Sequence, residues 1–241
     1  MPRTRTAGET AAEARLLARP TRLPKEPAEP GLHDLGLDKR RDGVLYIPSG
    51  YRADRPAPLV VLLHGAGGSA RPALAPFRPL ADDAGLILLA VDSRRQTWDV
   101  IEGGYGPDVA FLDRALAMTF AACAVDPARI AAQGFSDGAS YALSIGVSNG
   151  DLFTHVIAFS PGFMAPTRQR GMPKIFISHG TKDEILAIGP TSRRIVPQLR
   201  SAGYEVVYRE FDGPHTVPDA IAREALAWFT GGSGASGGSG G

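Results

Sequence analysis

Short runs of apolar residues recur along the chain from about residue 43, and longer segments that can form helices lie between them. Runs of this length predict β-strands at residues 44–47, 59–63, 86–91, 130–133, 155–159, 174–178 and 205–211. Helices are expected at residues 78–84, 107–121, 136–148, 191–202 and 218–229. Because several strands are apolar at consecutive positions, the sheet should be covered on both faces. The alternation therefore predicts the α/β class, with a mainly parallel, doubly wound sheet flanked by helices.

The two ends of the chain differ in composition from this middle part. Four prolines between residues 20 and 30 remove backbone donors and interrupt helices, so residues 1–31 are expected to form an extended N-terminal arm. Within this arm, the pattern of residues 15–19 leaves an edge strand and a frayed helix equally open. Residues 231–241 (GGSGASGGSGG) are typical of a flexible linker or tag and should be disordered. Residues 32–230 remain as one catalytic domain.

Composition excludes several classes of protein. The 241 residues are 44% hydrophobic and 21% charged, which is typical of a soluble globular protein and excludes general disorder. A formal net charge of +1 does not favour nucleic acid or an anionic membrane as the main partner. No apolar run approaches the roughly 18 residues that a transmembrane helix needs, so membrane insertion is not expected. The partner class that remains is a small molecule.

Cysteine content and the N-terminus bear on the cellular location. The single Cys123 cannot form an internal disulfide or a cysteine-rich zinc site, and its alanine-rich surroundings favour a buried small side chain. Residues 1–10 carry arginines but no apolar segment behind them. We therefore expect a cytoplasmic protein from the sequence as it stands, with a removed secretion signal left open as the alternative. The oligomeric state is not indicated.

The segment from Gly134 to Gly138 (GFSDG) has the G-x-S-x-G pattern of a nucleophile elbow, and it follows a predicted strand and precedes a predicted helix. A sharp turn of this kind strains the backbone at Ser136 and brings neighbouring chain close to it. Glycines two residues to either side remove the side chains that would collide. A plain turn with the same five residues is the alternative to a nucleophile, so the motif needs support from other parts of the sequence.

A serine hydroxyl becomes a nucleophile when a base accepts its proton and an acid orients that base. In proteins with this motif the acid and then the histidine follow the serine along the chain. His215 lies in a loop between the last strand and the last helix, where the base is expected, and Asp183 follows the strand at residues 174–178. We predict that Ser136, Asp183 and His215 form a catalytic triad.

Other acidic residues and histidines lie near these positions and are candidates for the same roles. Glu184 and Asp212 are rival acids, although Asp183 fits the turn after the strand better. His155 begins a strand too early in the chain for the base. His179 is expected to hydrogen-bond near the acid loop as a structural residue.

The tetrahedral intermediate of acyl transfer needs donors for its negatively charged oxygen. His64-Gly65-Ala66-Gly67-Gly68 follows a buried strand, and its small residues allow the backbone to approach a ligand. We predict that the backbone N–H groups of Ala66 and Asp137 form the oxyanion hole, and that His64 fixes the loop. Outside the Gly/Ser tail at residues 231–241, the sequence contains neither G-x-G-x-x-G nor G-x-x-x-x-G-K-[ST], which argues against a nucleotide site.

These four motifs, taken in order, resemble those of the α/β-hydrolase superfamily. The resemblance rests on residues 64–68, residues 134–138, Gly180-Thr181-Lys182-Asp183 and Gly213-Pro214-His215, and covers about residues 43–230. It is strongest to small serine esterases without a cap, namely the phospholipase/carboxylesterase, poly(3-hydroxyalkanoate) depolymerase-type and feruloyl-type families. It implies ester hydrolysis with no cofactor and no metal.

Two departures narrow the resemblance. The sequence shows no secretion signal, separate binding domain or disulfides, which does not suit an extracellular polymer depolymerase. Dienelactone hydrolases share the fold but generally use cysteine as nucleophile, and Ser136 argues against that group.

The substrate pocket is expected to be an open cleft beside the loop at residues 92–107. Trp98 and Tyr105 are candidates for an aromatic wall, with packing onto the core as the alternative for both. Gly67, Phe163 and Ile188 are further candidates for substrate contact.

Together these features predict a carboxylesterase-type serine hydrolase acting on short to medium acyl or aryl esters through an acyl-enzyme. An amidase or peptidase with the same triad is the alternative, because the sequence does not separate the two leaving groups. A non-catalytic binding protein of this fold would be expected to lack a triad member. The natural substrate, the acyl-chain preference and activity on polymers are not determined by these motifs.

Overall fold

The computed structural model describes residues 11–20, 24 and 27–231. Most of the predicted linker at residues 231–241, and parts of the predicted N-terminal arm, lie outside the described residues. Within the described part, none of the helices has the length and apolar character that a membrane span requires.

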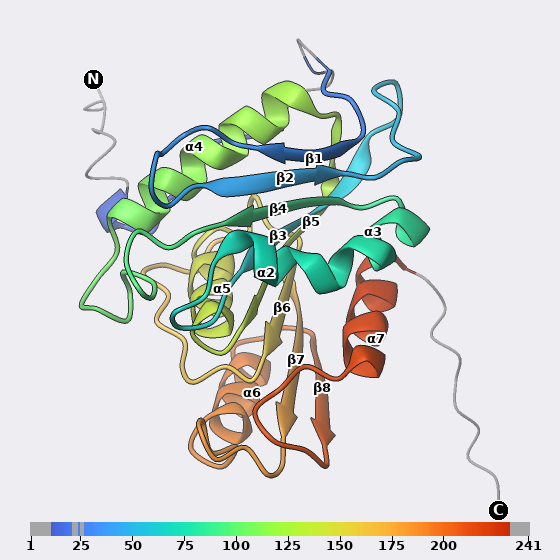
Figure 1. The fold of residues 1–241 in the computed structure, drawn as a ribbon. Helices are drawn as coiled ribbons and strands as arrows, with labels where there is room; N and C mark the ends of the chain where they lie inside the picture. The colour runs from blue at the N-terminus through green and yellow to red at the C-terminus, as the bar shows by residue number, and fades with distance from the viewer. Residues whose placement is uncertain (1–10, 21–23, 25–26, 232–241) are drawn as a thin grey trace, which may run out of the picture.

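A single eight-stranded sheet forms the centre of the described molecule, in the order β1-β2-β4-β3-β5-β6-β7-β8 (Figure 1). β2 pairs antiparallel with both β1 and β4, and the remaining pairs, from β4 through β3, β5, β6 and β7 to β8, are all parallel. The strands are β1 Gly31–Asp34, β2 Gly43–Ile47, β3 Ala57–Leu63, β4 Ile87–Val91, β5 Val125–Phe135, β6 His155–Phe159, β7 Lys174–Gly180 and β8 Val206–Phe211. The parallel arrangement brings the carboxyl ends of β3 to β8 to one edge, where loops can combine their side chains.

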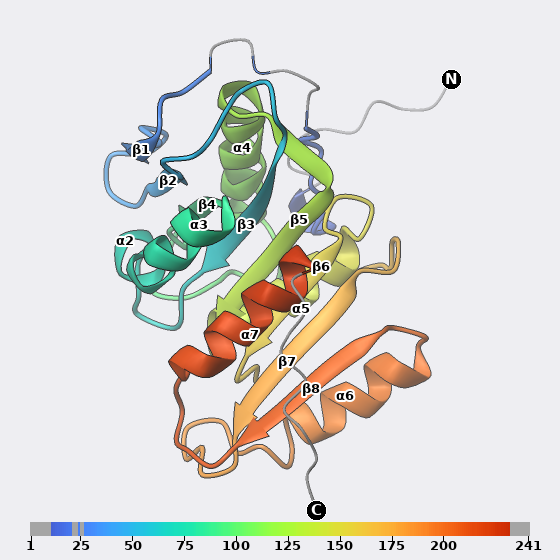
Figure 2. The same ribbon diagram turned by 90° about the vertical axis from the view of Figure 1, so that its right-hand side faces the viewer.

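Helices cover both faces of this sheet, as Figures 1 and 2 show. One face carries α2 (Ala70–Leu74), the short 3-10 helix η1 (Ala75–Phe77), α3 (Arg78–Ala84) and α7 (Asp219–Thr230). The other carries α4 (Pro107–Ala122), α5 (Asp137–Ser148) and α6 (Ser192–Ser201). Two clusters of buried apolar side chains correspond to the two faces. Burial on both sides explains the continuous apolar strands of the sequence.

The predicted class, a doubly wound and mainly parallel α/β sheet, is confirmed. All seven predicted strands and all five predicted helices are present, mostly within two residues of their expected ends. β1, α2 and η1 were not predicted, because three to five residues carry too little periodicity to identify an element. β5 begins five residues before its predicted start and includes Pro127.

The described part of the N-terminal segment packs on the molecule. Residues 15–19 form neither of the two elements considered from the sequence, a strand or a helix. Instead, Arg15 forms a two-bond ion pair with Asp151, at 2.6 Å for each bond, and the side chain of Leu16 is fully buried. Asn149 accepts a hydrogen bond from the Leu16 N–H at 2.9 Å. Side-chain contacts therefore hold this segment where backbone pairing does not.

Candidate active site

Ser136 occupies the sharp turn between β5 and α5. Its backbone angles are φ 58° and ψ −120°, a conformation that side-chain-bearing residues rarely adopt and that costs about 1 to 3 kcal/mol. A Cβ at Gly134 would collide with the carbonyl of Gly138, and a Cβ at Gly138 would collide with the carbonyl of Leu63. The two glycines of the motif are thus required by close backbone contacts around the turn.

The surrounding strands hold this turn in place. The Ser136 N–H donates to the carbonyl of Phe159 at the end of β6, at 2.9 Å. The residue is 8% exposed, and its hydroxyl makes no hydrogen bond to any described residue. Ser136 therefore presents an unengaged hydroxyl at the start of a helix, where the helix dipole favours developing negative charge.

Asp183 and His215 lie together at the carboxyl ends of β7 and β8. The Nδ1 atom of His215 is 2.5 Å from Oδ2 of Asp183, a short, charge-assisted hydrogen bond. The His215 ring also lies against the ring of Phe135, with centroids 4.7 Å apart, so it stands beside the residue that precedes Ser136. The structure thus brings the three predicted triad residues to the same edge of the sheet. The rival acid Asp212 instead pairs with Lys182 on the surface.

The environment of Asp183 favours the ionised carboxylate. Burial by itself would raise the pKa of Asp183, but the hydrogen bond from His215 opposes this effect. The N–H groups of Ile185 and Leu186 also donate to Oδ1, at 3.0 and 2.7 Å. Together these bonds hold the pKa of Asp183 below its ordinary value, so the carboxylate can orient the base and stabilise its protonated form.

His179 supports the acid from within the core. Its Nε2 lies 2.7 Å from the carbonyl of Leu186 and 3.1 Å from Oδ2 of Asp183, so this nitrogen carries the proton and Nδ1 accepts from the Ser192 hydroxyl at 2.7 Å. Burial lowers the pKa of His179, which keeps the ring neutral. Its position corresponds to the structural role expected from the sequence.

His64 holds the glycine-rich loop after β3. Nδ1 donates to the carbonyl of Gly65 at 2.7 Å, and Nε2 accepts from the N–H of Ser93 at 3.0 Å. Burial lowers the pKa of His64, which is consistent with a neutral ring that donates on one side and accepts on the other. The Gly67 N–H closes the loop by donating to the carbonyl of Gln96 at 2.7 Å.

The glycine-rich loop lies against Ser136. A Cβ built at Gly65 would be 3.5 Å from Cβ of Ser136. Among the described residues, the N–H groups of Ala66 and Asp137 make no hydrogen bond, and Ala66 is exposed. These are the two donors predicted for the oxyanion hole, and both are free to bind a ligand oxygen.

Trp98 is buried and Tyr105 is half-buried. Trp98 is 1% exposed, stacks on Tyr141 at 4.7 Å, and donates its indole N–H to the carbonyl of His64 at 2.8 Å. The Tyr105 hydroxyl donates to the carbonyl of Ala165 at 2.5 Å. Both aromatics thus make the packing contacts that were the alternative to a substrate wall, and the indole of Trp98 holds the start of the glycine-rich loop after β3, the predicted oxyanion loop (residues 64–68).

The remaining predicted contact residues have other positions. Gly67 is exposed on the oxyanion loop, Phe163 is half-buried in the loop after β6, and Ile188 is 7% exposed near α6. None of these residues, nor Trp98 or Tyr105, lines the pocket described next.

A row of serines on α5, not considered from the sequence, fixes the loop at residues 161–167. Ser140, Ser144 and Ser148 accept from the N–H groups of Gly162, Ala165 and Thr167, and each hydroxyl donates to the carbonyl four residues earlier. Their i, i+4 spacing within a predicted helix was the available signal. α5, which directly follows Ser136, therefore positions this loop.

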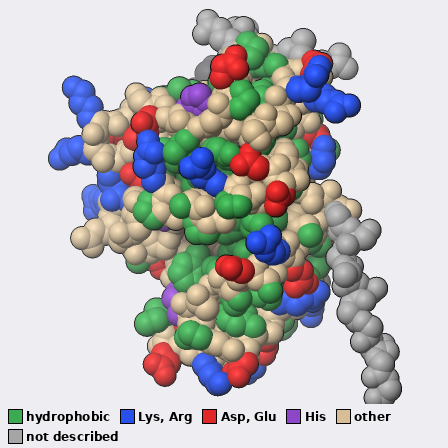
Figure 3. Space-filling view, turned by 45° about the vertical axis from the view of Figure 1, so that its right-hand side comes forward, with side chains coloured by type: hydrophobic (Ala, Val, Ile, Leu, Met, Phe, Trp, Pro, Cys, Tyr) green, Lys and Arg blue, Asp and Glu red, His purple; other side chains and the backbone are tan. Residues whose placement is uncertain are grey.

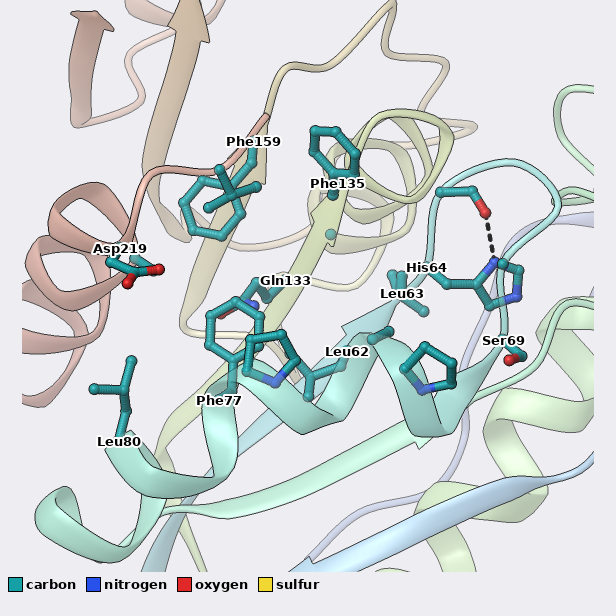
Figure 4. Close-up of a pocket in the computed structure, with 18 of the residues that line it drawn as sticks. Leu62, Leu63, His64, Ser69, Phe77, Leu80, Gln133, Phe135, Phe159 and Asp219 are labelled. Atoms are coloured by element: carbon teal, nitrogen blue, oxygen red, sulfur yellow. Dashed lines mark hydrogen bonds between the residues drawn. The ribbon is translucent and has the colours of Figure 1, made fainter. Parts of the chain in front are cut away.

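A pocket of about 590 Å³ lies between α2–α3 and α7, on the sheet face opposite α5 (Figure 4). Its lining includes His64 and Gly65 of the oxyanion loop, Phe135 of the elbow and Val217 after the histidine loop. The pocket therefore begins beside the predicted catalytic groups. Neither the sequence motifs nor the predicted contact residues indicated it, because it depends on how the helices are spaced over the sheet.

The described residues contain no group of three or more His, Cys, Asp or Glu side chains placed to hold a metal ion. The chemistry available at this edge of the sheet is that of a hydroxyl, an imidazole, a carboxylate and two backbone donors.

No family model and no curated protein sequence matches the chain. Solved structures do match. Esterase PE8 has 24% sequence identity and a TM-score of 0.65, covering 79% of this chain and 98% of that one. FphF, a fluorophosphonate-binding serine hydrolase of Staphylococcus aureus, has 11% identity and a TM-score of 0.67, covering 84% and 99%. The ferulic acid esterase AmCE1/Fae1A of Anaeromyces mucronatus has 19% identity and a TM-score of 0.64, covering 87% and 93%.

Similarity at this level of identity establishes the fold. The chain has the α/β-hydrolase fold that the four motifs implied, and no cap domain is seen in its described part. Because one fold hosts many activities, the function must be argued from the site itself.

Proposed function

We propose that the protein is a serine ester hydrolase that acts through an acyl-enzyme, with Ser136 as nucleophile, His215 as base and Asp183 as orienting acid. The observation that carries the proposal is the 2.5 Å bond between His215 and the buried Asp183, formed beside a strained serine with a free hydroxyl. Small acyl or aryl esters are the proposed substrates. The named esterases and serine hydrolases of the same fold support this reading.

The geometry suits a two-step displacement. In acylation, His215 accepts the Ser136 proton as Oγ attacks the ester carbonyl, and the N–H groups of Ala66 and Asp137 bind the oxyanion. Collapse of the intermediate breaks the bond to the leaving alcohol, which takes the proton from His215. In deacylation, water gives a proton to His215 and attacks the acyl carbon, and the carboxylic acid leaves as Ser136 recovers its proton.

Ser136→Ala tests the nucleophile directly. We expect hydrolysis of phenyl acetate to fall by roughly a thousandfold or more, because the variant retains only oxyanion stabilisation and binding. A fluorophosphonate probe should label the wild type, and tandem mass spectrometry should find the adduct on Ser136.

Ser160→Ala is a matched control. Ser160 directly follows the neighbouring strand β6, also has a positive φ of 50°, is fully buried, and its hydroxyl has no partner among the described residues. This variant should keep the wild-type rate. A wild-type rate for Ser136→Ala, or labelling at another residue, would exclude the proposed nucleophile. Comparison of phenyl acetate with acetanilide separates ester from amide hydrolysis.

A further inference from the structure

Gln133 interrupts an apolar row that runs across the sheet. In register with it lie Leu62 on β3 and Ile157 on β6, and the row continues to Ala90 on β4 and Phe176 on β7. All five residues are buried, and Gln133 is only 2% exposed. Its Oε1 atom has no hydrogen-bond partner among the described residues. An unpaired amide in such a row lowers stability, so its presence needs a reason.

The Gln133 side chain lines the 590 Å³ pocket. Figure 4 shows Gln133 among the lining residues, with Phe77 and Leu80 on the helical side and Phe159 at the end of β6. The volume lies within the range of sites for small molecules. Most of the lining is apolar, and the charged Asp219 and Arg223 are exposed, at the start of α7. The interior thus offers mainly apolar surface, with the unpaired Gln133 amide as a buried polar group within it.

The pocket adjoins the base side of the proposed catalytic site. Val217 lines it two residues after His215, and Phe135, which also lines it, contacts the His215 ring. In acylation the histidine protonates the oxygen of the leaving alcohol, so the alcohol lies on the histidine side of the reacting carbon. Gln133 lies on β5, three residues before Ser136. At roughly 3.3 Å per residue, its position along the strand is about 10 Å from that of Ser136.

We propose that this pocket binds the leaving alcohol of the ester as a medium-length alkyl chain, with Gln133 hydrogen-bonding a hydroxyl near the end of that chain. The inference rests on the proposed function and names its substrate class, monoesters of medium-chain diols. Figure 3 shows hydrophobic side chains gathered across this side of the molecule between scattered acidic and basic ones, which suits a neutral, apolar substrate.

Acetyl esters of different alcohols test the proposed alcohol pocket alone. All of them form the same acetyl-enzyme, so their rates differ only in the acylation step, in which the alcohol leaves. We would measure acetate release from methyl acetate, octyl acetate and ω-hydroxyoctyl acetate in a pH-stat. The wild type should have the highest kcat/KM for ω-hydroxyoctyl acetate and the lowest for methyl acetate.

Two pairs of variants test the two parts of the proposal. Ala73→Phe fills the pocket from α2, whereas Ala75→Phe adds the same ring at an exposed position two residues away that does not line the pocket. Ala73→Phe should lower the octyl-to-methyl ratio of kcat/KM by roughly tenfold or more, since several buried methylenes are lost, and Ala75→Phe should keep the ratio. Gln133→Leu should lower the hydroxyoctyl-to-octyl ratio by roughly fivefold, the effect of one hydrogen bond.

Other results of these experiments would overturn the proposal or the proposed function. Leu80→Trp, which fills the pocket from α3, replaces Ala73→Phe if that variant does not fold. An octyl-to-methyl ratio that is unchanged in the filled variants overturns the proposal. A selective loss of phenyl octanoate hydrolysis relative to phenyl acetate overturns it as well, because the pocket would then take the acyl chain. Absence of acetate release from every ester, together with an unlabelled Ser136, would instead refute the proposed function.

Discussion

Replacing Trp98 by phenylalanine would test whether the indole N–H positions the predicted oxyanion loop, without changing the proposed catalytic residues themselves. The indole N–H donates to the carbonyl of His64 at 2.8 Å, and the ring stacks on Tyr141. Phenylalanine keeps an aromatic ring for this stacking but has no donor. The His64 carbonyl would then be left in a buried environment without its partner, directly before Gly65 and the predicted oxyanion donor Ala66.

The size of the effect follows from two contributions. An unpaired buried carbonyl costs about 1 to 3 kcal/mol, and the smaller ring leaves a cavity that costs about 1 to 2 kcal/mol more. A loss near 3 kcal/mol would lower Tm by about 6 to 12 °C in a domain of this length. Displacement of the loop should also reduce kcat for phenyl acetate by at least about tenfold, because an oxyanion donor is worth roughly a hundredfold or more.

The chain offers a matched control, since Trp228 is its other tryptophan. Trp228 lies on α7, where its ring contacts His155 and Phe176, and it touches neither the oxyanion loop nor the pocket. Trp228→Phe should lower Tm while keeping kcat. Thermal unfolding by circular dichroism and steady-state kinetics would be measured on both variants. If Trp98→Phe lost stability but kept the wild-type kcat, the indole would not position the oxyanion donors, and the reasoning would be refuted.

Two further predictions concern stability. Burial against Trp228 and Phe229 lowers the pKa of His155 to about 4, below the roughly 6.5 of an unfolded chain, so the unfolded state gains a proton first as pH falls from 6.5 to 4. The urea midpoint of the wild type should therefore drop relative to that of His155→Phe between pH 7 and pH 4.5, and equal shifts would contradict the assignment. Ser144→Ala should cost about 1 to 3 kcal/mol and speed hydrogen exchange at the Ala165 amide, because it removes the acceptor at 2.9 Å; unchanged exchange would show that the serine row does not hold this loop.

The elements that the sequence predicted well are those with a strong local signal. Strands such as β3 and β4 are continuous apolar runs, and the ends of α3 and α7 are marked by prolines and glycines. β1 has only four residues, and its own sequence carries no pattern that would indicate its antiparallel pairing with β2. The same limit applies to residues 15–19, whose contacts with Asn149 and Asp151 could not be read from local composition.

The candidate site shows a similar division. Ser136, Asp183 and His215 were identified because a strained turn, a loop acid and a loop histidine each have a recognisable position in the sequence. The sequence does not decide the role of Trp98, because an aromatic residue in a loop gives the same signal whether it contacts a ligand or packs onto the core. The hydrogen bond to the His64 carbonyl decides between these alternatives, and it depends on two loops that are 34 residues apart.

The two faces of the sheet contribute differently to the proposed reaction. α5 begins directly after Ser136, and its serines fix the loop at residues 161–167, so the groups on this face are held by hydrogen bonds. On the opposite face, α2–α3 and α7 leave a pocket over Gln133 that contains few polar groups. The catalytic groups need fixed geometry, whereas an alkyl chain needs only apolar volume of suitable length. Substitutions in α2 or α7 should therefore change which alcohol is accepted without moving the catalytic groups, and this separation makes the alcohol series a test of the pocket alone.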